Sequence, residues 1–134
     1  MFLSIEDAKT LTTFEEIAGL SDAEVQRYID RADAWIRRTT GRYDLVDTDD
    51  ENVQEDLRLA TIMLVEYIWY WDQDEPKEQA ISRDDTVKIG SYTYDKMRAD
   101  SRGKTGNLEL DMILDSLKYN PAAFLFRTTR RNGI

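Results

Sequence analysis

The segment at residues 53–71 constrains the fold of this chain more than any other. Apolar side chains recur there at helical spacing and form one stripe along a predicted helix. Further apolar side chains extend the stripe around most of the helix, so more than one neighbour must cover it. Those neighbours can be other segments of this chain or other subunits. The stripe consists of Val53, Leu57, Ala60, Leu64, Tyr67, Ile68 and Trp71, and Leu59, Ile62, Met63 and Tyr70 extend it.

Helix boundary signals predict further helices on both sides of this segment. Ser21 and Glu24 form a capping box, and Gly41 is placed to end the helix that follows. A short helix is predicted to begin after Ser4, and a final helix after Asn107. The apolar face predicted for this final helix consists of Leu108, Met112, Ile113 and Leu117.

A different pattern follows the long helix. In TVKIGSYTYDKM, residues 86–97, apolar and polar side chains alternate around Gly90. The alternation predicts two short strands, or one bent strand with Gly90 at a bend or bulge. The predicted fold is therefore mainly α, a small bundle of about four to five helices with a short β-hairpin-like element after the long helix. It forms a single helical domain over residues 1–118, and residues 119–134 form a flexible tail that is first apolar and then basic.

The composition excludes most catalytic chemistries. The chain has no histidine and no cysteine, which removes the usual general base, thiolate nucleophiles and disulfides. The acidic clusters that begin at Asp47 and Asp72 lack the glycine and the glutamate that an EF-hand loop requires. Gly103-Lys104-Thr105 resembles the end of a phosphate-binding loop, but Arg98 stands where the first glycine is needed. We therefore predict a protein that is not an enzyme and holds no metal or cofactor.

Charge and hydropathy limit the partners. The net charge is −9, which makes the chain a poor general binder of nucleic acid. The longest apolar run, residues 62–71, contains Glu66 and is far shorter than the roughly 20 residues that span a bilayer. The N-terminus has acids where a signal peptide needs bases. The sequence predicts a soluble protein without a membrane contact or a readable export signal.

Three features favour a protein that binds other proteins. The first is the helix at residues 53–71, which is more apolar than a surface helix needs. The second is the loop at residues 97–107, which has two glycines and is predicted to be flexible, with Arg98, Arg102 and Lys104 as basic side chains. The third is the tail. Its apolar half includes Phe124 and Phe126, and its basic half holds Arg127, Arg130 and Arg131.

These elements resemble the head–tail connector, or adaptor, proteins of tailed double-stranded DNA phages and their prophage-encoded relatives. The resemblance covers residues 1–118 and lies in four segments taken in order. They are FLSIEDAKTL, the capped helix SDAEVQRYIDRADAWIRRTTGR, the long helix LRLATIMLVEYIWYW and the segment SRDDTVKIGSYTYDK. In that family, a polar stretch and then Ile-Gly-x-Tyr/Phe-Ser/Thr-Tyr commonly follow the long helix, and KIGSYTYDK fits this pattern.

The resemblance implies a small helical protein that is not an enzyme. It assembles into a ring beneath the portal and joins the portal to the next neck or tail component. DNA passes through the ring without specific binding. The implied location is the virion neck, and before assembly the cytoplasm of the bacterial host.

The resemblance also implies which residues contact the portal or a neighbouring subunit. On the hairpin segment they are Ile89, Gly90, Tyr92 and Tyr94. A further hypothesis is that lysine at Tyr92 or Tyr94 leaves the chain folded but blocks head–tail joining. In the tail, where the family varies, Phe124 and Phe126 are the expected anchors, with Arg127, Arg130 and Arg131 as rim contacts.

Two other interpretations stay open on the sequence alone. One is a small helical regulatory or binding module, antitoxin-like or an adaptor, with a single protein partner that the basic tail would dock. The other is an enzyme built on carboxylates such as Asp84 and Asp85, which would need a pocket where acids converge.

Overall fold

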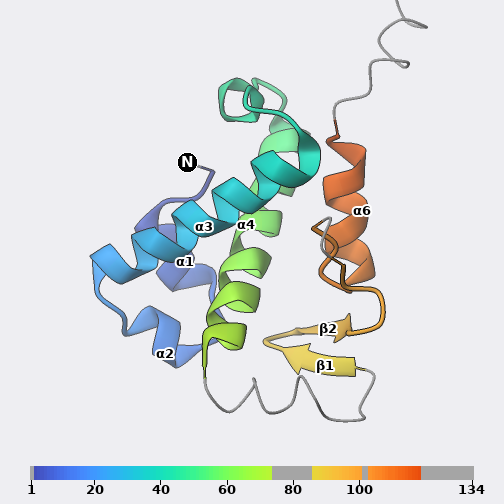
Figure 1. Cartoon of the computed structure of the whole chain (residues 1–134). Helices are drawn as coiled ribbons and strands as arrows, with labels where there is room; N and C mark the ends of the chain where they lie inside the picture. The colour runs from blue at the N-terminus through green and yellow to red at the C-terminus, as the bar shows by residue number, and fades with distance from the viewer. Residues whose placement is uncertain (1, 74–85, 101–102, 119–134) are drawn as a thin grey trace, which may run out of the picture.

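The structure is a computed structural model of the chain, and the residues that it describes are 2–73, 86–100 and 103–118. Its elements in chain order are α1 (Ile5–Leu11), α2 (Glu15–Ala18), α3 (Asp22–Thr40), the 3-10 helix η1 (Leu45–Asp47), α4 (Glu51–Asp72), β1 (Thr86–Ile89), β2 (Tyr92–Asp95) and α6 (Leu108–Ser116). Figure 1 shows the helices around α4 and the hairpin at one end of them. The prediction of a mainly helical fold with a short hairpin after the long helix is confirmed.

Helix α3 begins and ends at the residues that the sequence signals predict. The Ser21 hydroxyl accepts a hydrogen bond from the Glu24 amide at 3.3 Å. Gly41 takes a left-handed backbone conformation, with φ of 69°, and its amide donates to the Arg37 carbonyl. Glycine adopts this conformation at little cost, so the helix stops there. The buried hydrophobic side chains of α3 are Val25, Ile29, Ala32 and Ile36.

Helix α4 lies at the centre of the fold. The Asp50 carboxylate caps its first turn by accepting hydrogen bonds from the amides of Asn52 and Val53. Helices α3 and α6 and strand β1 all contact it. Every residue from position 60 to position 66 is buried, which is nearly two full turns. The prediction that several neighbours cover this helix is confirmed, and segments of the same chain supply the cover.

The hairpin follows the first of the two possibilities that the alternation left open, which is two short strands. Strands β1 and β2 pair antiparallel, with Ile89 opposite Tyr92 and Val87 opposite Tyr94. Gly90 and Ser91 form the two-residue turn, and Gly90 has a φ of 61°. Glycine is preferred at the first position of such a turn because a side chain there is strained. Gly90 is therefore in a turn between two strands, and not at a bulge in one bent strand.

The face predicted for the final helix is wrong in part. In α6 the buried side chains are Leu110 and Leu114, with Leu117 just after it, whereas Leu108 is 60% exposed and Met112 is 61% exposed. The cause is the rotation of the helix about its axis. On α6, Asp111 accepts hydrogen bonds from the preceding loop, and these contacts turn the Leu108–Met112 face outward.

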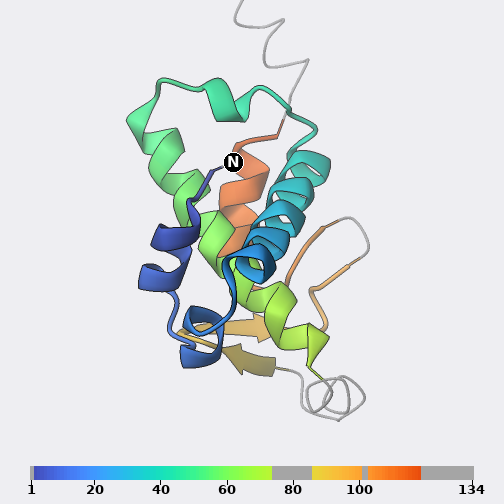
Figure 2. The ribbon, with the colours of Figure 1, turned by 90° about the vertical axis from the view of Figure 1, so that its left-hand side faces the viewer.

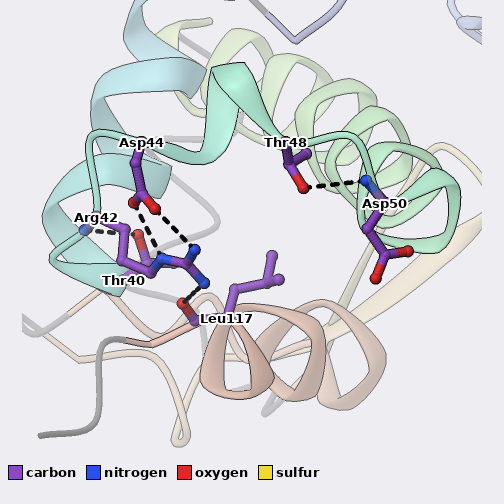
Figure 3. Close-up of polar contacts among 6 residues, drawn as sticks. All are labelled: Thr40, Arg42, Asp44, Thr48, Asp50 and Leu117. Carbon is purple, nitrogen blue, oxygen red and sulfur yellow. Dashed lines mark hydrogen bonds and ion pairs between the residues drawn. The ribbon is translucent and has the colours of Figure 1, made fainter. Parts of the chain in front are cut away.

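The C-terminal end of α6 is tied to the segment that follows α3. The Arg42 guanidinium forms two contacts with the Asp44 carboxylate, at 3.1 and 3.0 Å, and a longer one with the Leu117 carbonyl at 3.5 Å (Figure 3). This arginine holds the pKa of the Asp44 carboxyl below its usual value by hydrogen bonding to the charged form. The contact places the C-terminal end of α6, at Leu117, beside the segment between α3 and α4 (Figure 3).

Candidate functional site

The hairpin segment divides its side chains between the core and the surface. Val87, Ile89 and Tyr94 are buried, and Ile89 and Tyr94 are each only 1% exposed. Gly90 and Tyr92 are half-buried at the turn. Of the four hairpin residues expected to contact a partner, Ile89 and Tyr94 therefore pack within the chain itself. Of these four residues, only Gly90 and Tyr92 keep surface that another molecule could contact.

The turn of the hairpin lies against a buried carboxylate on α4. A Cβ atom added to Gly90 would stand 2.8 Å from the Thr13 hydroxyl and 3.2 Å from a carboxylate oxygen of Glu66. Distances this short leave no room for a side chain, and the positive φ disfavours one as well. Glycine at position 90 thus lets the hairpin backbone approach α4 and the α1–α2 connection closely.

Glu66 is 3% exposed and binds the connection between α1 and α2. Its Oε2 atom accepts three hydrogen bonds: from the Thr12 hydroxyl at 3.1 Å, from the Thr13 amide at 3.1 Å and from the Thr13 hydroxyl at 2.9 Å. A carboxylate buried without such donors would lower the stability of the fold strongly. The three donors compensate for its burial, and they fix α1 and α2 to the middle of the fold.

An open groove lies between α1, α4 and the hairpin turn, and we call it the α1–α4 groove. It encloses about 330 Å³. Apolar side chains from all three elements line it, and Glu66 lines it as well. Figure 2 shows α1 on the left, the hairpin turn below it and α4 to its right. The lining residues are Leu11, Thr13, Glu55, Arg58, Leu59, Ile62, Glu66, Ser91 and Tyr92.

An aromatic cluster joins the hairpin to the other side of α4. The rings of Tyr94 and Tyr67 lie 4.9 Å apart, and Tyr67 also contacts Trp35 and Trp71 at 5.8 and 6.3 Å. Burial raises the pKa of the Tyr94 hydroxyl, and the negative charge of Glu66 raises it further. A hollow of about 240 Å³ lies beside Tyr67, Trp71 and Tyr94. These contacts make Tyr94 a structural residue.

Trp69 packs within the chain as well. It lies outside the main apolar stripe, and its ring contacts that of Phe14 at 4.9 Å. The wide aromatic side chain therefore covers the start of α2, which begins directly after Phe14.

The described part of the basic loop is held by several contacts. The indole of Trp35 donates to the Gly103 carbonyl at 2.9 Å, and the Asp100 carboxylate accepts from the Lys104 amide. A Cβ atom on Gly103 would overlap the Thr39 side chain, so this glycine permits close packing against α3. Arg98 forms a long ion pair with Asp95 at 3.7 Å. Arg102 lies outside the described residues.

The end of this loop also closes one edge of the hairpin. The Asn107 side chain donates to the Thr93 carbonyl at 3.0 Å, and its oxygen caps α6 by accepting from the Leu110 amide at 2.9 Å. The Asp95 amide donates to the Gly106 carbonyl. These bonds occupy backbone groups on the outer edge of β2. In the sheet that the structure describes, β1 forms the other edge.

The predicted tail residues Phe124, Phe126, Arg127, Arg130 and Arg131 lie outside the described residues. Asp84 and Asp85, the carboxylates of the enzyme interpretation, also lie outside them. Within the described ranges, no group of three or more acidic side chains could hold a metal ion. No described helix is both long and apolar enough to cross a membrane.

The site at Glu66 was not predicted from the sequence. The signal was a single charged residue in the apolar run at residues 62–71, on a helix predicted to be covered on most sides. A charge at such a position must have buried hydrogen-bond donors. Its donors, however, lie more than 50 residues away along the chain, so sequence spacing could not name them.

Comparisons of this chain with protein-family models, with curated proteins and with solved structures found no match.

Proposed function

We propose that this protein is a head–tail connector of a tailed double-stranded DNA phage or prophage. It is one subunit of a ring that joins the portal to the next neck or tail component around the DNA channel. The proposal rests on the resemblance in the sequence, and the observation that supports it most is the order of the elements. A capped helix, a long buried helix and a hairpin with an Ile-Gly-Ser-Tyr turn follow one another in the fold.

The hairpin supports the proposal because its turn is partly accessible and is packed against the helices. Gly90 lies close to the side chains of Thr13 and Glu66, so the turn is packed against α4 and the α1–α2 connection. Tyr92, beside the turn, is half-buried and lines the α1–α4 groove. An aromatic side chain at the edge of a groove is a suitable anchor for a protein partner, because its ring offers a large contact area.

The charge of the chain also supports a place beside DNA without specific binding. The net charge of −9 repels phosphate groups at moderate salt. A channel wall of this charge lets DNA slide through without adhering. The prediction for DNA is therefore weak binding that stays weak at low salt.

The experiment that tests the proposal is light scattering on the full chain, alone and mixed with the candidate portal protein. A complex of ring size with the portal supports the connector function. A chain that does not bind the portal contradicts the connector function and favours a regulatory module with one protein partner. Portal, capsid and tail genes beside its gene would agree with the first outcome.

A pair of matched variants makes this test specific to the hairpin. Tyr92→Lys places a charge at the edge of the groove, whereas Tyr43→Lys makes the same change at an exposed tyrosine in the turn between α3 and η1. We expect Tyr92→Lys to reduce portal-dependent assembly and Tyr43→Lys to leave it unchanged. Equal behaviour of the two variants would remove the hairpin from the assembly contact.

A further inference from the structure

The α1–α4 groove has an apolar wall on the surface of the chain. Leu11, at the end of α1, is 50% exposed, and Leu59 and Tyr92 are half-buried. Ile62 forms the deeper part of the wall, with 7% exposure. Covering such side chains with a partner is favourable, because it removes apolar surface from water.

A negatively charged side chain also lines the groove. Glu66 lines it, and all three hydrogen bonds that the described residues donate to its carboxylate reach Oε2. The Oε1 atom accepts none of them, so one face of a nearly buried carboxylate keeps its capacity for a further donor. A guanidinium group meets such an oxygen with short, charge-assisted hydrogen bonds.

The groove therefore fits a segment in which large apolar side chains are followed by arginine. The chain has such a segment of its own in Phe124-Leu125-Phe126-Arg127. Residues 119–134 contain three arginines and no acidic residue, whereas residues 1–60 contain 15 acids and 7 bases. Glu55 adds a second carboxylate to the groove, and Arg58 is the one basic side chain among the described residues that line it.

The positions of the groove and of the tail favour a contact between two copies. The tail begins after Leu117, whose carbonyl contacts Arg42 at the end of the molecule where α3 finishes and α4 starts. Glu66 lies 15 residues along α4 from Glu51, or about 22 Å, toward the end that holds the hairpin (Figure 1). A tail that leaves one end of the molecule and a groove toward the other end produce a head-to-tail contact, which can repeat around a ring.

We propose that the α1–α4 groove of one copy binds the C-terminal tail of the next copy. Phe124 and Phe126 cover the apolar wall, and the Arg127 guanidinium pairs with the free oxygen of Glu66. The ten residues from Leu117 to Arg127 span up to about 33 Å when extended, which is enough to reach a neighbour. This inference rests on the self-association that the proposed function requires, and it specifies the contact.

The first experiment is sedimentation velocity on the full chain over a series of concentrations. We expect the unmodified chain to self-associate, and both Leu59→Lys in the groove and Arg127→Glu in the tail to weaken association at least about tenfold. Leu108→Lys is the matched control, because Leu108 is an exposed leucine on α6, outside the groove. Circular dichroism checks that each variant is folded, and Leu11→Lys replaces Leu59→Lys if the latter is not.

Mixing the two variants gives the decisive measurement. The Leu59→Lys chain keeps an intact tail, and the Arg127→Glu chain keeps an intact groove. We expect the mixture to form a dimer and nothing larger, since only one contact per pair can form. A mixture that stays monomeric overturns the proposal, as does a tail that docks on its own chain and leaves the unmodified protein monomeric at every concentration.

The portal experiment separates this proposal from the proposed function. A chain that is monomeric alone but forms a ring-sized complex with the portal overturns the tail contact and leaves the connector function supported. A chain that associates through the groove but does not bind the portal supports the tail contact and contradicts the connector function.

Discussion

Glu66 accepts two hydrogen bonds from Thr13, one from the backbone amide at 3.1 Å and one from the side-chain hydroxyl at 2.9 Å. The two residues are 53 positions apart in the chain. Their contact connects the α1–α2 segment to the central helix, directly under the hairpin turn. The same carboxylate lines the α1–α4 groove, so a residue that stabilises the fold also contributes negative charge to the groove.

Removing this carboxylate should destabilise the protein. In Glu66→Ala, the amide and hydroxyl of Thr13 lose their acceptor in a partly buried site. We expect the free energy of unfolding to fall by about 2–4 kcal/mol, measured by urea denaturation. Glu66→Gln keeps an acceptor oxygen and should cost clearly less. Equal losses for the two variants would mean that the hydrogen bonds to Oε2 do not matter for stability.

Gly90→Ala should cost more than the same change at another left-handed glycine. Gly41 and Gly90 have similar φ values, 69° and 61°, but a Cβ atom meets nothing within 4 Å at Gly41 and meets Thr13 and Glu66 at Gly90. We expect about 1 kcal/mol of destabilisation for Gly41→Ala from the backbone alone. Gly90→Ala should be destabilised by that amount and, in addition, by the cost of displacing Thr13. Urea denaturation measures both variants. A smaller loss at Gly90 would contradict the close approach of the turn.

A lysine substitution should affect stability very differently at the two tyrosines of β2. Tyr94 is 1% exposed, so Tyr94→Lys removes a core ring and buries a charge. We expect a loss of at least about 3–5 kcal/mol, enough to unfold a domain of ordinary stability. Tyr92 is half-buried at the groove, and Tyr92→Lys should leave the thermal midpoint within a few degrees. Thermal unfolding followed by circular dichroism compares them, and a folded Tyr94→Lys chain would contradict the buried position of Tyr94.

The raised pKa of Tyr94 predicts a loss of stability in alkaline solution. An unfolded tyrosine releases its proton near pH 10, whereas Tyr94 keeps its proton in the folded chain above that pH. The folded state then binds more protons than the unfolded state, so the free energy of unfolding falls as the pH rises above about 10. Tyr94→Phe should flatten this fall between about pH 9.5 and 11 in urea denaturation. Tyr43→Phe, at an exposed tyrosine, is the control and should leave the slope unchanged.

Local signals in the sequence determined most of the helical architecture. Ser21, Gly41 and Asn107 cap helix ends at the positions that the sequence predicts. A cap can be predicted in this way because it is a contact between residues only a few positions apart. The alternation at residues 86–95 likewise predicted the hairpin, since a two-residue turn requires only a suitable glycine.

Only the tertiary structure decided which faces of these elements are covered. The helix α6 has leucines on more than one side, and hydrogen bonds from the loop to Asp111 selected the side with Leu110 and Leu114 for burial. The pairing of Glu66 with Thr12 and Thr13 was also decided at this level. Helical periodicity describes one segment at a time, whereas rotation, burial and the partners of a buried charge depend on neighbours that are distant in the chain.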